Sequence, residues 1–368
     1  MTLGAVVASG FAGPLAWKLG RKSCLWAACL LCAASDAIMM GTTSIGALYV
    51  GRFFIGLANG LFMTFSQLYI QECSPAKYRG LMLSAFQFWT SIGTLVGTVV
   101  DNFTAPLEGK KEYLIPLGLI YVIPFFIAVS LFFIPESPRW LMEKGKTEKA
   151  RKSMLWLRPN KDAVDGELAG IQDAIDEANA AESGTSLFLD MFRGVDLRRT
   201  LLAVGAVNTQ AASGAMFMIA YGTYFFEMAG VGKPFENSVA LVTVGVVAII
   251  LNTCIITRYG RRRTFLISGL ILCAITMLII AIVYNIQPKA PSTGKLMVGI
   301  SVVYIFGYNG MSRRECILFS WDGLLISFAG MISSYAWLSG GELPSQRLRS
   351  YTFGLAASVG FFGAWLAT

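Results

Sequence analysis

The chain has 368 residues, of which 55% are hydrophobic and only 14% are charged, and its mean hydropathy is +0.60. This composition leaves too little polar surface to cover a water-soluble globule, so it favours a chain folded in lipid. The net charge of +8 does not indicate nucleic-acid binding, because the basic residues occur in short clusters between apolar segments. The chain contains no histidine, which excludes a histidine-ligated metal site and a Ser-His-Asp triad.

Apolar segments recur along almost the whole chain. Most are about 17 to 25 residues long, which is enough to cross the hydrocarbon core as a helix. In chain order, the sequence predicts spans near residues 1–17, 23–42, 46–70, 81–101, 112–134, 199–226, 236–256, 264–284, 294–339 and 351–368. The segment 294–339 is too long for a single crossing. The expected fold class is therefore an all-α membrane protein.

Basic residues fall on every second connection between these spans, and the positive-inside rule places that side in the cytoplasm. The clusters are Lys18, Arg21 and Lys22; Lys77 and Arg79; Arg258, Arg261, Arg262 and Arg263; and Arg347 and Arg349. The one long polar stretch, 135–198, is rich in Lys and Arg and is expected on the same side. Helical composition at 142–158 and 163–182 predicts short amphipathic surface helices rather than a soluble domain.

The long polar stretch separates two bundles of helices. We expect an N-terminal bundle at 1–134, a cytoplasmic helical linker at 135–198 and a C-terminal bundle at 199–368. This organisation places the two groups of spans on either side of one surface segment.

A repeat relates the two halves of the chain. Gly20-Arg21-Lys22 has a counterpart in Gly260-Arg261-Arg262. The spacing from Glu72 to Arg79 is the same as that from Glu342 to Arg349. Repeated halves of this kind are typical of transporters.

Three motifs in a fixed order carry a resemblance to a known family. They are Tyr69, Glu72, Pro75, Arg79 and Gly80; then Pro135-Glu136-Ser137-Pro138-Arg139-Trp140-Leu141; then Gln210 with Ser213-Gly214. Over everything except residues 311–330, the chain resembles the sugar porters of the major facilitator superfamily, in particular fungal alpha-glucoside, lactose-type or hexose permeases. The resemblance implies two six-helix bundles around a central sugar site, rocker-switch alternating access, and no enzymatic activity or cofactor.

Charged residues at the cytoplasmic ends of the predicted helices are candidates for a gate. They are Glu72, Arg79, Glu136, Arg139, Glu342 and Arg349. Opposite charges there can pair across the bundles and hold the inward mouth shut; the alternative is solvated end charges with no gating role. Arg52 matches an arginine that the family keeps near the start of a span, and it is a further candidate or an interfacial residue.

Sugar recognition needs amides that hydrogen-bond hydroxyl groups and an aromatic ring for the apolar face of the pyranose. By resemblance, Gln87 and Gln210 match the sugar-binding glutamines of the family. Trp337 matches its tryptophan near the sugar, and Tyr221 an aromatic position after the third motif; packing against lipid or other helices is the alternative for both. Asn309 aligns with a position facing the sugar if residues 311–330 are removed, as does Tyr308.

The chain also departs from the family pattern. Ala211, Met216 and Ala220 replace a glutamine, an asparagine and a tyrosine that face the sugar in the family, which argues against ordinary glucose selectivity and makes a disaccharide a candidate. Trp17 and Thr257 replace the acid of the family's G-x-x-x-D-R-x-G-R motif, so those two loops keep only its basic part.

Residues 311–330 interrupt a predicted span with several charges, whose burial is costly. Joining Gly310 to Met331 restores an uninterrupted span ending at Glu342, so we interpret the segment as a retained intron; a re-entrant insertion is the alternative. By resemblance Met1 falls in the second span and Thr368 in the eleventh, which predicts a truncated chain with about ten of twelve helices.

The sequence therefore predicts a monomeric carbohydrate transporter of the plasma membrane, either a proton symporter or a facilitator, with a mono- or disaccharide substrate. Its expected partners are a small sugar, protons and the lipid bilayer, without nucleic acid, metal or cofactor. A sugar sensor that does not transport and an inactive truncated gene product are the alternatives; sensors of this family usually carry a long cytoplasmic tail, which argues against the first.

Overall fold

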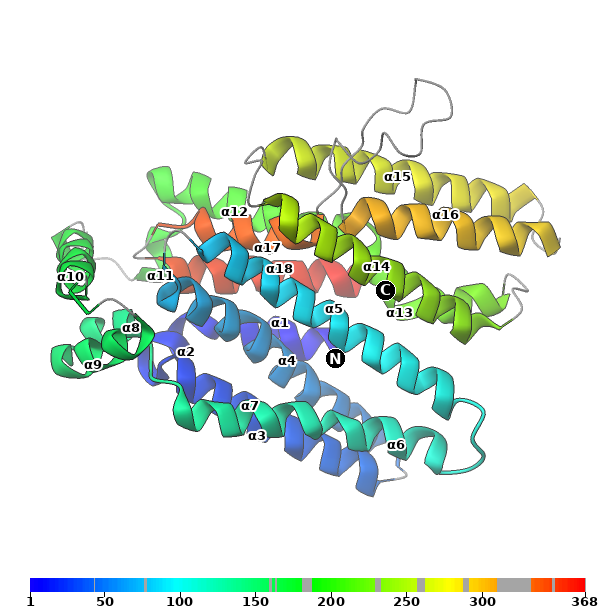
Figure 1. The fold of residues 1–368 in the computed structure, drawn as a ribbon, viewed down its shortest axis with the longest axis horizontal. Coiled ribbons are helices and arrows are strands. Elements are labelled where there is room, and N and C mark those ends of the chain that lie inside the picture. Colours follow the sequence, from blue (N-terminus) through cyan, green and yellow to red (C-terminus); the bar gives the residue numbers. More distant parts are fainter. Residues whose placement is uncertain are drawn as a thin grey trace. The chain divides into compact units, whose positions relative to one another are not determined.

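The computed structural model describes residues 1–42, 44–75, 78–158, 161–162, 164–180, 187–228, 233–256, 262–286, 291–309, 332–345 and 348–367. Within these residues every regular element is a helix (Figure 1). The all-α prediction is therefore confirmed. Residues 311–330 lie outside the described part, as do Thr257, Arg258, Arg261 and Arg347.

The helices follow the predicted spans closely. In chain order they are α1 (Thr2–Gly10), α2 (Ala12–Leu19), α3 (Arg21–Gly41), α4 (Ile45–Cys73), α5 (Arg79–Thr104), α6 (Lys111–Ile120), α7 (Val122–Phe133), α8 (Pro138–Glu143), α9 (Thr147–Leu157), α10 (Val164–Ala180), α11 (Leu187–Asp190), α12 (Gly194–Ala212), α13 (Ala215–Met228), α14 (Pro234–Ile256), α15 (Arg262–Ile286), α16 (Pro291–Asn309), α17 (Ile332–Glu342) and α18 (Arg349–Ala367).

Six helical segments of the described chain are long and apolar enough to cross a membrane. They are Arg21–Gly41, Ile45–Cys73, Arg79–Thr104, Lys111–Phe133, Gly269–Ile286 and Arg349–Ala367. Each one corresponds to a predicted span. Pro234–Ile250 and Leu296–Ile305 are shorter apolar helical segments at two further predicted spans.

Two predicted spans are each divided into two helices by a proline. The break at Phe11 lies three residues before Pro14, and the break at Tyr121 lies three residues before Pro124. Proline lacks an amide hydrogen and its ring collides with the carbonyl four residues earlier, which interrupts the helix at this distance. The predicted span 199–226 is divided instead at Gly214, whose φ is +80°.

Contacts within the chain define two compact units. The first comprises Met1–Arg79, Leu117–Gly205 and Ser339–Trp365, and the second comprises Gly80–Pro116, Ala206–Leu338 and Leu366–Thr368. Each unit draws on both halves of the sequence. The bundle boundaries expected at 1–134, 135–198 and 199–368 remain predictions.

In the first unit, α1 lies directly against α4. A Cβ atom at Gly56 would be 2.0 Å from the carbonyl oxygen of Met1, and one at Gly60 would be 2.8 Å from that of Ala5. Small residues let helix backbones approach this closely, and such packing drives helix association in lipid. Next to this contact, the hydroxyl of Ser35 on α3 donates to the carbonyl of Gly51 on α4 at 2.6 Å.

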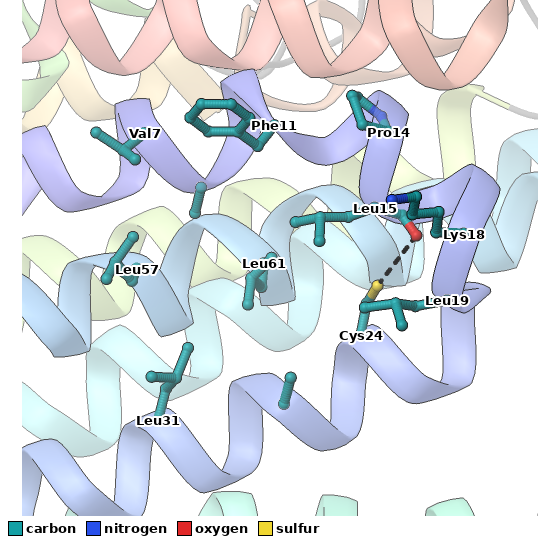
Figure 2. Close-up of a pocket in the computed structure, with 12 residues that line it drawn as sticks. Val7, Phe11, Pro14, Leu15, Lys18, Leu19, Cys24, Leu31, Leu57 and Leu61 are labelled. Carbon is teal, nitrogen blue, oxygen red and sulfur yellow. Dashed lines mark hydrogen bonds between the residues drawn. The ribbon is translucent and has the colours of Figure 1, made fainter.

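An apolar groove of about 550 Å³ is lined by residues of α1 to α4 (Figure 2). Its wall is almost entirely aliphatic and aromatic. The residues around it are Val7, Ala8, Phe11, Pro14, Leu15, Lys18, Leu19, Cys24, Ala27, Leu31, Leu57 and Leu61. An apolar surface of this kind suits a helix face in contact with lipid.

The polar stretch forms short helices, as predicted: α9 and α10 lie within the expected 142–158 and 163–182. Their apolar sides form a small core with α8, made by Leu141, Met142, Ala150, Met154, Val164 and Leu168. Ser137 caps α8, because its hydroxyl accepts the Trp140 amide hydrogen and Pro138 occupies the first helical turn.

The core of the second unit is formed by α13 to α16. It consists of Ala215, Met218, Phe226, Leu241, Cys273, Tyr304, Ile305 and Tyr308. The rings of Tyr304 and Tyr308 stack with their centroids 6.4 Å apart, and the Tyr304 hydroxyl donates to the carbonyl of Ser213 at 3.1 Å. This bond links α16 to the break between α12 and α13.

We expect Gly60→Ala to lower the melting temperature of the detergent-solubilised protein. The added methyl group would meet the Ala5 carbonyl and lie 3.0 Å from the Ala8 Cβ, and overpacking of this kind costs about 1–3 kcal/mol. Gly46→Ala on the same helix is the control, because nothing lies within 4 Å of its Cβ position. Equal melting temperatures for Gly60→Ala and the wild type would contradict the close contact of α1 and α4.

Candidate functional site

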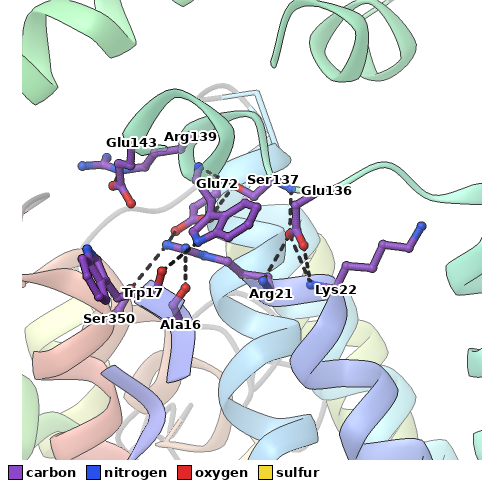
Figure 3. A network of polar contacts seen from close by, with 11 residues as sticks. Ala16, Trp17, Arg21, Lys22, Glu72, Glu136, Ser137, Arg139, Glu143 and Ser350 are labelled. Carbon is purple, nitrogen blue, oxygen red and sulfur yellow. Dashed lines mark hydrogen bonds and ion pairs between the residues drawn. The ribbon is translucent and has the colours of Figure 1, made fainter. Parts of the chain in front are cut away.

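Polar contacts of the first unit converge on a buried ion pair (Figure 3). Arg21, the first residue of α3, places Nη2 2.6 Å from Glu72 Oε1 on α4, and their side chains are 3% and 2% exposed. The guanidinium also donates to the carbonyl of Ala16 at 3.2 Å and to the hydroxyl of Ser350 at 3.4 Å. The pair therefore joins α2, α3, α4 and α18.

The Pro135–Leu141 motif supplies the next layer of contacts. The hydroxyl of Ser137 donates to the second oxygen of Glu72 at 2.5 Å. The Glu136 carboxylate accepts the backbone amide hydrogens of Arg21 at 3.1 Å and Lys22 at 3.2 Å. A carboxylate at this position satisfies amides that have no partner within the helix, and it interacts favourably with the α3 dipole.

Gly20 makes the Glu136 contact possible. Its φ of +86° lies in the left-handed region, and a Cβ there would be 2.7 Å from Glu136 Oε2. The repeated Gly-Arg motif predicted from the sequence thus has a structural reason in its first copy. Glycine lets the carboxylate approach, and the arginine turns toward Glu72.

Trp17, which replaces the acid of the family motif, makes different contacts. Its carbonyl accepts the indole N–H of Trp140 at 3.2 Å, and Lys144 Nζ lies 3.7 Å from its ring centroid. A cation over an indole face is attracted by the ring quadrupole. The end of α2 is therefore attached to α8 without a carboxylate at residue 17.

Most of the other gating candidates lie at or next to helix ends. Arg139 bonds Glu143 one turn later on α8 at 3.1 Å, while Arg52 is exposed on α4. Arg79 begins α5, Glu342 ends α17 and Arg349 begins α18. The structure brings four of the candidates to one cavity of about 350 Å³: Glu72, Arg79, Arg139 and Arg349.

Ion pairs attach the linker helices to this region. Arg158, the residue directly after α9, bonds Glu167 on α10 at 2.9 Å, and it donates to the carbonyl of Cys73 at the end of α4. Farther out, the exposed Arg151 guanidinium bonds both oxygens of Asp165 at 2.8 and 3.1 Å. That hydrogen bonding holds the pKa of the Asp165 carboxyl below its usual value.

Two of the predicted sugar residues meet in the second unit. The indole N–H of Trp337, a residue only 6% exposed, donates to the side-chain oxygen of Gln210 at 2.6 Å. The Gln210 carbonyl accepts the Ser213 hydroxyl at 2.7 Å, at the break before α13. The first residue of the Gln-Ser-Gly motif is therefore held by both its side chain and its backbone.

The remaining sugar candidates are less tightly grouped. Gln87 is buried on α5, while Tyr221 on α13 is 41% exposed. Asn309 is the last residue of α16, directly after the buried Tyr308, and its side chain lies outside the described part. The Gln210–Trp337 hydrogen bond thus joins two of the five sugar candidates, and their role in binding sugar stays a prediction.

Two residues that make central contacts in the two units were not singled out from the sequence. Arg21 was identified only as one of several basic residues, although its repeat with Arg261 was a usable signal. Tyr304 was not identified, and its spacing of four residues from Tyr308 on one helix face is the signal that would have found it. Among the described residues, no group of three or more His, Cys, Asp or Glu side chains is placed to hold a metal ion.

Arg21→Gln is expected to destabilise the protein by about 3–5 kcal/mol, because it leaves the Glu72 charge buried without its cation. Thermal unfolding followed by tryptophan fluorescence measures the loss. Arg151→Gln is the matched control, since it removes an exposed arginine from an exposed pair and is expected to change little. The buried pair would not be a structural centre if both variants unfolded at the same temperature.

The sequence is similar to those of known proteins. The family model described as "Sugar (and other) transporter" matches residues 1–368. The chain is 30% identical over 311 residues to the glucose transporter GlcP of Staphylococcus epidermidis, covering 83% of this chain and 67% of that protein. It is 28% identical over 368 residues to the high glucose sensor RGT2 of Saccharomyces cerevisiae, covering 98% of this chain but 45% of that protein.

Solved structures show the same fold. The proton:xylose symporter XylE bound to 6-bromo-6-deoxy-D-glucose superposes with a TM-score of 0.80 at 19% identity, covering 100% of this chain and 75% of that one. A sequence identity of 19% supports a shared fold but does not indicate a shared function. The family match covers the whole chain, and the chain therefore belongs to the sugar transporter family, with the fold of the major facilitator superfamily.

Proposed function

We propose that this protein carries a mono- or disaccharide across a membrane by rocker-switch alternating access. The observation that carries the proposal is the hydrogen bond between Trp337 and Gln210, which sets an amide beside a large aromatic ring. Several proteins similar to this chain are sugar transporters: a glucose transporter, a galactose-proton symporter and a proton:xylose symporter.

The chemistry of this pair suits a sugar hydroxyl. An indole N–H can only donate, so the atom of Gln210 that faces it is the amide oxygen. The amide NH2 group is then the end that can donate to a sugar. We assign Gln87, Tyr221 and Asn309 to the same binding site, with the indole of Trp337 as the ring that lies near the pyranose.

We assign the cytoplasmic gate to the buried pair and the helix-end charges around it. Rocking would separate α3 from α18 and break the Arg21–Ser350 hydrogen bond. Packed contacts of this kind have discrete arrangements rather than a continuous range, so they can act as a switch. The gating residues in this proposal are Arg21, Arg52, Glu72, Arg79, Glu136, Arg139, Glu342 and Arg349.

Coupling and location form the finer part of the proposal. We propose proton symport in preference to facilitated diffusion, because two of the named relatives are proton symporters. We also propose that the protein acts as a monomer in the plasma membrane. Uptake that depends on an imposed proton gradient in proteoliposomes would support symport. Uptake that is independent of the gradient would identify a facilitator.

A sugar sensor is the second candidate function. It is favoured by the match to the yeast high glucose sensor along 98% of this chain. A sensor binds sugar without moving it. Sugar binding by the purified protein together with no uptake into proteoliposomes would therefore favour the sensor, and the absence of both would indicate an inactive product.

Gln210→Ala is expected to weaken sugar binding by about tenfold, because it removes a substrate hydrogen bond and leaves the Trp337 indole N–H without its acceptor. Equilibrium binding of labelled glucose, galactose, xylose and maltose to the purified protein measures the effect and ranks the substrates. Gln172→Ala on the exposed face of α10 is the matched control. An unchanged affinity in Gln210→Ala would remove Gln210 from the binding site.

Arg79→Ala is expected to abolish uptake into proteoliposomes while sugar affinity is unchanged, since the residue lies at the cytoplasmic cavity and not beside Gln210. Arg199→Ala, which removes a half-exposed arginine near the start of α12, is the control and should transport normally. Normal uptake by Arg79→Ala would contradict its gating role.

A further inference from the structure

The wall of the cytoplasmic cavity in the first unit is rich in arginine. The cavity has a volume of about 350 Å³, and four arginines line it: Arg79, Arg139, Arg158 and Arg349. Among the described residues of the wall, the acids are Glu72 and Glu167. The wall therefore carries more positive than negative charge.

The acids of the wall are already engaged. Glu72 bonds Arg21 through one oxygen and Ser137 through the other. Glu167 bonds Arg158 through both oxygens, at 3.1 and 2.9 Å. Glu143, the partner of Arg139, does not line the cavity.

Donors in this region are left without acceptors. The Nε atoms of Arg79 and Arg349 are buried and have no hydrogen-bond partner among the described residues. Arg349 also experiences the positive charges of Arg139 and Arg79, which the negative charges of Glu72 and Glu342 offset only in part. Buried donors without acceptors and neighbouring like charges both oppose the folded state, and a bound anion would relieve both.

We propose that this cavity is a binding site for a phosphate-bearing anion, separate from the sugar site. Guanidinium groups match the oxygens of phosphate in geometry and charge. Helix α18 begins at Arg349, and the positive end of its helix dipole adds to the positive field. The volume accommodates a phosphate monoester with ordered water.

The same phosphate chemistry has two sources, a soluble phosphate and a phospholipid headgroup. The soluble source is favoured, because Arg158, Glu167 and Gly170 bring the polar linker helices α9 and α10 to the cavity wall. A bound anion would connect the end of α4 to α8 and α18. Occupancy would thereby stabilise the contacts assigned above to the closed gate.

Gly170 offers a test that removes no arginine. It lines the cavity, and nothing lies within 4 Å of its Cβ position, so Gly170→Asp adds a negative charge there without a steric collision. Gly166→Asp is the matched control: it lies one turn earlier on α10, is equally unobstructed and is not part of the wall. Arg349→Gln is a second variant that weakens the site from the opposite wall.

The experiment titrates inorganic phosphate against the melting temperature of the purified full chain, with sodium chloride holding ionic strength constant. Phosphate is expected to raise the melting temperature of the wild type and of Gly166→Asp. Gly170→Asp and Arg349→Gln are expected to need about tenfold more phosphate for the same rise, because each changes the charge of the wall by one unit. A parallel series uses mixed micelles of phosphatidate or phosphatidylcholine.

The possible outcomes distinguish a soluble phosphate from a phospholipid headgroup, and both from failure of the proposal. Stabilisation by phosphate that Gly170→Asp weakens assigns a soluble ligand. Stabilisation by phosphatidate alone, also weakened by Gly170→Asp, assigns a lipid headgroup. A response that is equal in Gly170→Asp and Gly166→Asp, or no response to either probe, overturns the proposal. Because no step measures sugar, this result is independent of the proposed transport function.

Discussion

The buried ion pair between Arg21 and Glu72 is the constraint on which the first unit depends. Removing two charges from water costs several kcal/mol per ion. Their mutual attraction offsets this cost only when the remaining hydrogen-bonding positions are also satisfied. Here the Ser137 hydroxyl donates to the second oxygen of Glu72, and the Ala16 carbonyl and the Ser350 hydroxyl accept from Arg21, although Arg21 Nε has no partner among the described residues. Three separate stretches of sequence must therefore be in place before the pair is stable, which makes their arrangement cooperative.

Around this pair, small residues bring the helices close enough for the polar groups to meet. Gly354 and Gly13 allow α18 to lie against α1 and α2, and the Ser358 hydroxyl donates to the carbonyl of Val6 at 3.0 Å. Interfaces of small residues with few side-chain hydrogen bonds can separate without exposing a large apolar core. The same contacts that hold the first unit together are thus suited to the rocking motion proposed for the carrier.

The departures from the family pattern fall into two kinds. Trp17 is compensated, because Trp140 and Lys144 contact it where the family motif has an acid. Ala211 is buried beside Gln210 and its side chain has no polar atom, so the polar side chains at the end of α12 are those of Gln210 and of Ser213, which follows it. A binding site with fewer polar groups on one helix must take its specificity from elsewhere, which is consistent with a substrate other than a single hexose.

The sequence by itself determined the helices, their lipid environment and the family, because hydropathy, proline breaks and the Pro135–Leu141 motif are properties of short segments. Only the tertiary structure decided the partners. Gln210 and Trp337 are 127 residues apart, and Glu136 reaches α3 across 115 residues, so no local pattern specifies either contact. The sequence predicted Glu136 as a charge at the gate, and only the structure shows that its carboxylate also caps α3. No local pattern specifies that contact, because a carboxylate binds whichever donors the packed helices bring to it.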